Sequence, residues 1–186
     1  MGRQILSWSD VDELMEHLMP QFYGAFDAVL MIGRGGLIPG GLIAERLRMT
    51  CLLTTAVSFP ADSPSDLRSL LLDRPGKPVT GAALQEAFSL RSMPAFHHFP
   101  TEDDLLGRRI LVVHHVWNHG RAINAVAGRV VAAGGRPESA VLHYKPAQSI
   151  FPQLKPDYYA AVTDDFVIYP WEAAHRLEPY RPMPVI

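Results

Sequence analysis

The residues best suited to bind an anion lie between His114 and Ala122, where an apolar run ends and a helical pattern begins. Residues 110–113 are all apolar and predict a buried strand, and apolar residues at spacings of three and four predict a helix from Ala122 onward. A glycine-containing loop before a helix presents unpaired backbone N–H groups and the positive end of the helix dipole. Arg121 adds a positive charge there. This stretch therefore predicts a turn that binds phosphate or a similar anion.

A second apolar run with a glycine-rich loop lies earlier in the chain. Residues 28–32 have the pattern of a strand that is covered on both faces of a parallel sheet. Arg34, Gly35 and Gly36 follow in a loop whose glycines permit close backbone approach to a ligand, and a helix is expected after Pro39. Taken alone, this motif is explained equally well by a tight turn without a ligand.

These two units predict an α/β fold with a mostly parallel sheet flanked by helices. An N-terminal helix is expected with Ser9 as its N-cap, and further strands are expected at residues 51–57 and 139–144. Two short strands are expected within residues 156–172. Residues 58–107 are rich in proline and show little strand periodicity apart from one amphipathic piece at residues 82–90, which predicts either a lid or a plain surface excursion.

Length and composition restrict the classes of function. The chain of 186 residues fits one domain, and its net charge of −2 gives no sign of nucleic-acid or membrane binding. The single cysteine, Cys51, excludes an internal disulfide framework and a cysteine-based zinc site. No apolar run is long enough for a membrane span. The sequence therefore predicts a cytoplasmic protein whose partner is a small molecule.

Residues 110–122 resemble the signature of the type I phosphoribosyltransferases, in which four apolar residues precede two acids, two apolar residues, Asp-Thr-Gly and a basic residue followed by Thr. Here His114 and His115 replace the acid pair, Asn118 replaces the third acid, and His119 and Ala122 replace the threonines. In that family the stretch binds the ribose and the 5′-phosphate of 5-phosphoribosyl 1-diphosphate (PRPP). The resemblance implies the same contacts for His114, His115, Asn118, His119, Gly120, Arg121 and Ala122.

The same resemblance assigns roles to the two other motifs. An Arg-Gly-Gly helps to bind the pyrophosphate of PRPP in the xanthine-guanine branch, which implies that role for Arg34, Gly35 and Gly36. The C-terminal residues 156–172 resemble the base-recognition end of the purine enzymes, including the hypoxanthine-type members. There a lysine bonds the purine 6-oxygen, an aromatic residue stacks on the base, and a backbone group reads its edge. The matching residues are Lys145, Phe166 and Val167.

These residue types fit recognition of a 6-oxopurine. An ammonium group distinguishes a 6-oxo from a 6-amino purine, and an aromatic face stacks on the base. The alternatives are a solvated lysine at a strand end and an aromatic residue of the core. The hypothesis of a base site rests on Lys145, Phe166 and residues 170–172 together, because they occur in the same order as in the resembled family.

The replaced acids affect catalysis. Mg²⁺, which accompanies PRPP in the family, prefers oxygen ligands, and imidazole is a poor substitute for carboxylate. The third acid is a candidate general base, a role that the Asn118 amide cannot fill and that His119 is proposed to take over. His114 and His115 should point to opposite faces if they lie in a strand, so no metal site is predicted.

The sequence thus predicts one phosphoribosyltransferase-like domain over residues 1–186, with residues 58–107 as a hood or flexible lid. The first functional hypothesis is transfer of phosphoribose from PRPP to a 6-oxopurine, with catalytic residues Asn118 and His119 and with Mg²⁺ as cofactor. The alternative is a catalytically inactive relative that binds a purine nucleotide or phosphate ligand as a sensor or regulatory module, without a cofactor. Family members are often homo-oligomers, so the resemblance allows a homo-oligomer as well.

Overall fold

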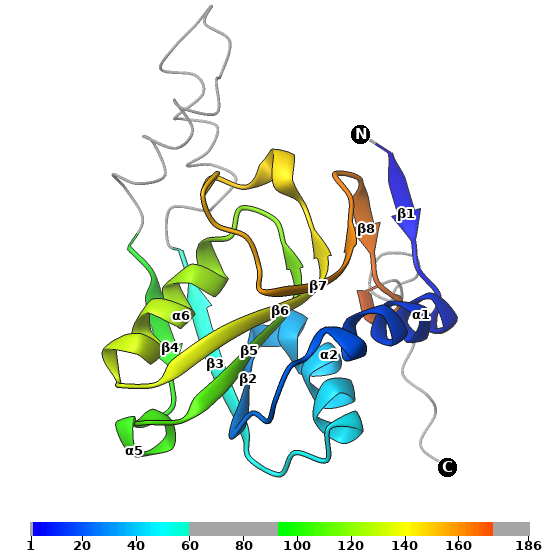
Figure 1. The fold of residues 1–186 in the computed structure, drawn as a ribbon. Helices are drawn as coiled ribbons and strands as arrows, with labels where there is room; N and C mark the ends of the chain where they lie inside the picture. The colour runs from blue at the N-terminus through cyan, green and yellow to red at the C-terminus, as the bar shows by residue number, and fades with distance from the viewer. Residues whose placement is uncertain (1, 60–92, 173–186) are drawn as a thin grey trace, which may run out of the picture.

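The computed structural model describes residues 2–59 and 93–172 of the chain, which form a sheet with helices on both faces (Figure 1). The first half contains β1 (Arg3–Ile5), α1 (Trp8–Leu18), the 3₁₀ turn η1 (Met19–Gln21), β2 (Ala28–Ile32), α2 (Gly33–Arg46) and β3 (Leu52–Ser58). The second half contains β4 (Ala95–His98), α5 (Glu102–Leu105), β5 (Arg109–Trp117), α6 (Arg121–Ala132), β6 (Arg136–Tyr144), the 3₁₀ turn η3 (Pro146–Gln148), β7 (Tyr158–Val162) and β8 (Phe166–Ile168).

The main sheet has six strands in the order β4-β3-β2-β5-β6-β7. All neighbouring strands are parallel except β3 and β4, which pair antiparallel at one edge. The chain reverses its direction across the sheet between β3 on one side and β6 on the other, with β2 and β5 adjacent in the centre. In open α/β sheets, ligands bind outside the carboxyl ends of the strands at such a switch point. The mixed α/β fold with a mostly parallel sheet is therefore confirmed.

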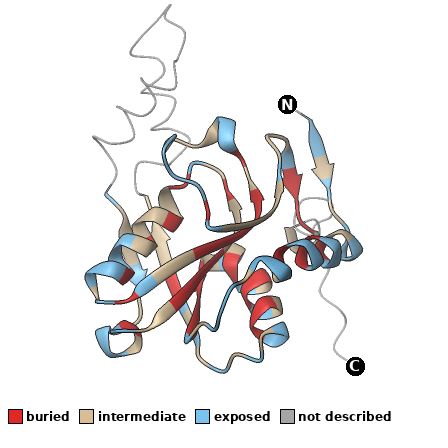
Figure 2. Ribbon diagram, in the orientation of Figure 1, coloured by how far each residue is buried: buried red, intermediate tan, exposed pale blue. Residues whose placement is uncertain are grey.

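Alternating residues of the central strands fill two separate cores, as the period of a strand requires. On one face, Val29 and Met31 of β2 pack with α1 and α2, and on the other face Leu30 and Ile32 pack with α6 and Leu105 of α5. Figure 2 shows buried residues along the central strands. Both faces are covered, which explains why residues 28–32 and 110–113 are apolar without alternation.

A second, two-stranded sheet lies beside the main one. β1 pairs parallel with β8, so that Arg3 is opposite Phe166 and Gln4 is opposite Val167. The two predicted C-terminal strands exist as β7 and β8, but they belong to different sheets. The beginning of the chain thereby becomes part of the segment that carries the predicted base-binding residues.

Several local predictions need correction. The N-cap of α1 is Ser7 and not Ser9, because Ser7 and Asp10 form a reciprocal capping box. The glycines at residues 33–36 form the first turn of α2 and not a loop before it. β5 continues through His114 and His115 to Trp117, so that the turn before α6 is shorter than predicted.

Part of the predicted lid belongs to the core. β4 extends the main sheet, and Thr55 donates a hydrogen bond to the carbonyl oxygen of His98 at 2.9 Å. Leu105 of α5 is completely buried. Residues 60–92, with the amphipathic piece at 82–90, lie outside the described residues, so the lid remains a prediction there. No helix in the described part of the chain is long and apolar enough to cross a membrane.

Candidate functional site

Three central strands end at the same edge of the sheet, and the residues that follow them form the candidate site (Figure 1). β2 leads directly into the first turn of α2, β5 leads into the turn before α6, and β6 ends beside Lys145. The order of the strands therefore brings together the segments that follow β2, β5 and β6, which lie far apart in the sequence.

A cavity of about 260 Å³ lies beside Lys145. It contains all three residues that were predicted to bind a base, together with Asn118. Its lining consists of His115, Val116, Asn118, Lys145, Gln148, Phe166, Val167, Tyr169 and Glu172. Residues from β5, β6 and β8 thus meet around one volume.

Lys145 is buried, with 6% of its surface exposed. Its ammonium group donates a hydrogen bond of 2.5 Å to the carbonyl oxygen of Asp165. Burial lowers the pKa of Lys145, and the negative charges of Asp164 and Asp165 partly oppose this change. Lys145 is not a solvated lysine at a strand end, since its charged group is held at the wall of the cavity.

Phe166 and Val167 present different groups to the same cavity. The Phe166 side chain is 45% exposed although it is a large apolar residue, so it is not a residue of the core. The Val167 side chain is buried in the core, and its backbone is held in register with Gln4 of β1. An exposed aromatic face beside an ordered backbone is suited to stacking and edge recognition of a planar ring.

A larger cleft of about 560 Å³ adjoins this cavity, because His115 and Glu172 line both. It opens at the first turn of α2, whose first backbone N–H groups have no partner within the helix. The lining consists of Ile32, Gly33, Arg34, Gly35, Val57, His114, His115, Ala122, Trp171 and Glu172. The predicted pyrophosphate residues Arg34 and Gly35 are among them.

Gly36 lines neither cavity. A Cβ atom at this position would overlap the carbonyl oxygen of Val113, so its glycine permits close packing of α2 on β5. The structure thus gives Gly36 a packing role, and no contact with the cleft supports its predicted role in pyrophosphate binding.

The two histidine rings lie side by side, with centroids 4.4 Å apart, so the prediction that they point to opposite faces is wrong. The His114 ring turns back toward its own strand, where Nδ1 lies 2.9 Å from the carbonyl oxygen of Val116. A carbonyl oxygen only accepts, so Nδ1 of His114 carries the proton and Nε2 of the neutral ring keeps a lone pair. The rings fit against α2 only because residue 35 is glycine, since a Cβ there would overlap the His115 ring.

Both rings are neutral near neutral pH. Burial lowers the pKa of His114, and the bond to Val116 opposes this only in part. Burial lowers the pKa of His115 well below its usual value, and the neighbouring His114, His143 and Lys145 act in the same direction, while a contact with the backbone of Gly35 opposes them in part. The nearest carboxylate, that of Glu172, is 3.9 Å from Nε2 of His115.

Three buried polar atoms in the described residues lack a hydrogen-bond partner, namely Nδ1 of His115, Oδ1 of Asn118 and Nε1 of Trp171. All three residues line one or both cavities. Buried polar groups normally have partners, and an exception is expected where a ligand or water supplies the partner. These atoms therefore support the two cavities as the candidate site.

Tyr169 connects the site to the core and was not identified from the sequence. Its hydroxyl donates to the carbonyl oxygen of His115 at 2.9 Å and lies 2.8 Å from Nδ1 of His143. Because the hydroxyl proton is used on the carbonyl, Nδ1 of His143 must be the donor to Tyr169. Burial lowers the pKa of His143 to about 4 and raises that of Tyr169 well above its usual range.

Other residues at the site were also not assigned a role. Trp171 stacks on Tyr169 with ring centroids 4.8 Å apart, and Glu172 and Gln148 line the smaller cavity. The sequence contained one signal for the first two, because the ending Pro-Trp-Glu at residues 170–172 follows the pattern of the resembled family. Nothing in the sequence singled out Gln148.

The turn at residues 118–120 has the expected geometry before a helix. Gly120 is the N-cap of α6 with φ = 79°, and a Cβ there would lie 2.6 Å from the Trp117 indole. Arg121 begins α6, and its guanidinium lies 3.9 Å from the centre of the Phe59 ring. His119 is exposed and, like Gly120 and Arg121, lines neither cavity, whereas Ala122 borders the larger cleft.

The side chains at the site do not fit Mg²⁺. No group of three or more His, Cys, Asp or Glu residues that could hold a metal ion occurs in the described ranges. Oxygen ligands among the lining side chains come from Asn118, Gln148, Tyr169 and Glu172, and imidazoles come from His114 and His115. These side chains therefore do not supply a set of ligands suited to Mg²⁺.

The fold has many solved counterparts. A purine phosphoribosyltransferase from Pyrococcus horikoshii is 23% identical with a TM-score of 0.65, over 100% of this chain and 99% of that protein. A hypothetical protein from Neisseria gonorrhoeae with bound ppGpp is 19% identical with a TM-score of 0.68, over 92% and 90% of the two chains. The xanthine-guanine-hypoxanthine phosphoribosyltransferase of Helicobacter pylori is 15% identical with a TM-score of 0.64, over 94% and 96%.

No protein-family model matches the sequence, and no curated protein matches it. At these identities the similarity establishes the fold, which is that of the purine phosphoribosyltransferases of type I.

Proposed function

We propose that this protein binds a 6-oxopurine nucleotide, with the base in the smaller cavity and the phosphate groups in the larger cleft. The observation that carries the proposal is the convergence of Lys145, Phe166 and Val167 on one cavity that adjoins the first turn of α2. Each of these residues alone has an ordinary structural explanation. Their meeting around one cavity does not follow from those explanations.

The base side of the site has the chemistry for a 6-oxo group. The Lys145 ammonium can donate to a purine 6-oxygen, whereas the 6-amino group of adenine offers only donors in that plane. Phe166 is aromatic and 45% exposed beside the cavity, which suits it for stacking on a base. Hydrogen bonds to a charged group contribute about 1.5–3 kcal/mol, so a preference of roughly 10- to 150-fold for a 6-oxopurine is expected.

The ribose and phosphate side differs from a metal-dependent site. The lone pair on Nε2 of neutral His114 can accept a hydrogen bond from a ribose hydroxyl, which a carboxylate would otherwise do. The neutral His114 ring lacks the negative charge by which a carboxylate attracts Mg²⁺. The N-terminus of α2 and the guanidinium of Arg34 provide positive potential at the cleft for phosphate.

The two histidines and Asn118 favour nucleotide binding over phosphoribosyl transfer. Neutral histidines replace the acid pair, and the Asn118 amide cannot accept a proton as a general base. The fold similarity to the Neisseria gonorrhoeae protein with bound ppGpp supports a guanine nucleotide as the class of ligand. A role as a sensor or regulatory module follows from this proposal.

Phosphoribosyl transfer from PRPP to a 6-oxopurine is the second candidate. The observation in its favour is the carboxylate of Glu172, which borders both cavities and could assist at the junction of base and ribose. In this reading Asn118 and His119 are the proposed catalytic residues, with His119 and not Asn118 as the general base, and Mg²⁺ arrives bound to the PRPP pyrophosphate. The fold similarity to purine phosphoribosyltransferases supports this candidate as well.

A calorimetric titration with IMP, GMP and AMP in excess EDTA tests the binding proposal. We expect IMP and GMP to bind without Mg²⁺ and about tenfold or more tightly than AMP, because only they can accept from Lys145. Lys145→Met should remove this preference, while Lys155→Met, a change at an exposed lysine away from the cavities, should retain it. Absence of IMP and GMP binding, or equal affinity for AMP, would contradict the proposal.

A turnover assay separates the two candidates. The folded protein is incubated with PRPP, Mg²⁺ and a mixture of guanine, hypoxanthine and xanthine, and nucleotide and pyrophosphate are measured by mass spectrometry. Many turnovers per protein molecule would establish the second candidate. No product from protein that binds IMP would leave nucleotide binding as the function.

A further inference from the structure

The turn between β7 and β8 contains Asp165, which makes contacts in two directions. Its backbone carbonyl oxygen accepts the hydrogen bond from Lys145 Nζ at 2.5 Å. Its carboxylate accepts a hydrogen bond of 2.6 Å from the backbone N–H of Gly2 and one of 3.3 Å from Nε2 of Gln4. Asp165 thus lies between the charged group of the base cavity and the beginning of the chain.

The N-terminal strand is bound to the same segment by its backbone. The N–H of Phe166 donates to the carbonyl oxygen of Gly2 at 3.0 Å, and Gln4 also approaches Thr163 Oγ1 at 3.4 Å. β1 pairs with β8 through all three of its residues. Residues 163–167 are therefore held on one side by residues 2–5, which are about 160 positions away in the sequence, a separation that local propensity cannot encode.

We propose that Asp165, held by Gly2 and Gln4 of the N-terminal strand, is a positioning residue that directs the Lys145 ammonium toward the purine 6-oxygen. This inference rests on the proposed function, because it concerns the same base cavity. Asp165 acts through Lys145 and does not itself touch the nucleotide. A second consequence is that β1 forms part of the base site even though none of its residues lines the cavity.

The charges around Lys145 support this role. The acidic groups facing it are Asp164 and Asp165 of the turn, and the other titratable groups are His143 of β6 and His115 of β5. Both histidines are neutral at neutral pH because burial lowers their pKa. The two aspartates are thus the charges that favour the ammonium form, and loss of the Asp165 charge should lower the pKa of Lys145 further.

Selective loss of base discrimination is the first test. Asp165→Asn and Gln4→Ala are titrated with IMP, AMP and ribose 5-phosphate, which lacks a base. We expect the affinity for IMP to fall about tenfold, toward that for AMP, while AMP and ribose 5-phosphate keep their affinities within about twofold. The matched control is Gln21→Ala, because the Gln21 side chain also makes hydrogen bonds, with the backbone of His17 and of Tyr159, away from the cavities.

An equal loss of affinity for all three ligands would show a general structural role and would overturn the inference. So would variants that keep the full preference for IMP. Failure of the wild-type protein to bind IMP would instead contradict the proposed function, and the second test then decides the inference alone.

The second test needs no nucleotide. The rate of acetylation of Lys145 by acetic anhydride is followed against pH by mass spectrometry, with the exposed Lys155 as an internal reference. In Asp165→Asn, Lys145 should become reactive at lower pH than in the wild-type protein, while the profile of Lys155 stays unchanged. An unchanged Lys145 profile would overturn the inference whether or not the protein binds a nucleotide.

Discussion

His143 shows how the surroundings of one residue decide its charge. It is 3% exposed, it contacts Tyr169, and Lys145 lies close enough to disfavour a second positive charge. Its pKa is therefore lowered from 6.5 to about 4, and burial is the larger cause. The neutral ring donates to Tyr169, which in turn donates to the carbonyl oxygen of His115 at the edge of both cavities.

The stability of the protein should depend on the protonation of His143. The unfolded chain takes up a proton near pH 6.5, whereas the folded protein does so only near pH 4, so the free energy of unfolding falls as the pH decreases through this interval. Between about pH 7 and pH 5, the free energy of unfolding of His143→Gln should therefore decrease by about 2 kcal/mol less than that of the wild-type protein. Urea unfolding at both pH values measures the difference.

His98→Gln is the control for this prediction, since His98 is exposed on β4. It should retain the wild-type decrease. The buried His114 and His115 contribute in the same direction, so His143→Gln should reduce the decrease without removing it. Identical decreases for the wild-type protein and His143→Gln would contradict the assignment.

At the scale of elements, the close approach of α2 to β5 brings the cleft and the histidines together. Gly36 faces the backbone of Val113, and Gly35 faces the rings of His114 and His115. The glycines of this motif therefore bring the helix N-terminus against the strand that carries the histidines. Gly41, further along α2, has open space around it.

This difference predicts opposite effects for one type of substitution in one helix. Gly36→Ala should lower the free energy of unfolding by roughly 1–3 kcal/mol, because its Cβ would overlap a carbonyl oxygen that cannot move independently of β5. Gly41→Ala should raise it by roughly 0.5–1 kcal/mol through higher helix propensity. Urea unfolding of both variants tests this, and stabilisation by Gly36→Ala would show that α2 does not pack as closely as described.

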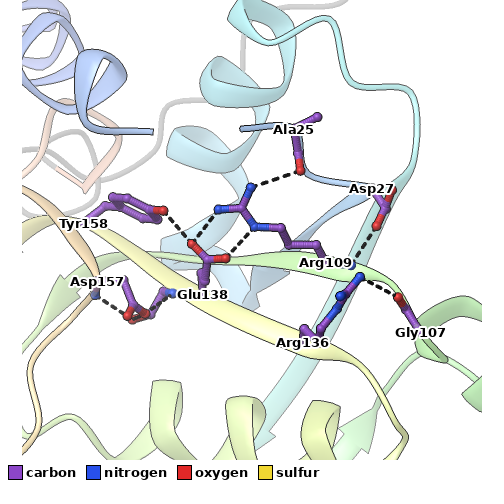
Figure 3. A network of polar contacts seen from close by, with 9 residues as sticks. Ala25, Asp27, Gly107, Arg109, Arg136, Glu138, Asp157 and Tyr158 are labelled. Atoms are coloured by element: carbon purple, nitrogen blue, oxygen red, sulfur yellow. Dashed lines mark hydrogen bonds and ion pairs between the residues drawn. The ribbon is translucent and has the colours of Figure 1, made fainter. Parts of the chain in front are cut away.

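At the scale of the whole molecule, the two ends of the sheet have different roles. The carboxyl ends of the strands carry the cavities and the unpartnered polar atoms. The amino ends carry a network in which polar groups satisfy one another (Figure 3). There Arg109 binds both carboxylate oxygens of Glu138 at 2.5 and 2.9 Å, and Tyr158 donates to the same carboxylate at 2.5 Å.

The network connects the beginnings of three strands and a loop. Arg109 begins β5, Glu138 is near the start of β6, and Tyr158 begins β7. Arg109 also donates to the carbonyl oxygen of Ala25 and lies over the ring of Phe26 at 4.3 Å from its centre. These contacts lower the pKa of Glu138, with the hydrogen bond to Arg109 as the main cause.

Glu138→Gln should therefore reduce stability without affecting ligand binding. We expect a loss of about 1 kcal/mol in the free energy of unfolding, a moderate value because the pair is partly exposed and screened by solvent. The affinity for IMP should stay within about twofold of the wild-type value, because the network is at the opposite end of the strands. Thermal unfolding and the IMP titration are measured on the same preparations.

Asp12→Asn, which removes the exposed pair with Arg46, is the matched control and should change stability by less than about 0.5 kcal/mol. A large loss of IMP affinity in Glu138→Gln would show that the two ends of the sheet are coupled.

The local part of the fold could be predicted from the amino-acid sequence. Apolar runs at residues 28–32 and 110–113, each followed by glycine and a helical pattern, predicted the mostly parallel α/β sheet, and the fold confirms it. Lys145 and Phe166 were predicted as members of one site, and they line one cavity. These features depend on side-chain period and on glycine, which act over a few neighbouring residues.

Which distant groups meet could be seen only in the folded chain. The side-by-side histidines depend on the packing of α2, the junction of the cavities depends on Glu172, and the hold on Asp165 depends on β1. Residues 95–98 form strand β4 because they pair with the edge strand β3, although their own pattern of apolar and polar residues predicts a strand only weakly. Each of these contacts joins segments far apart in the chain, so its free energy depends on long-range pairing and packing and not on any local pattern.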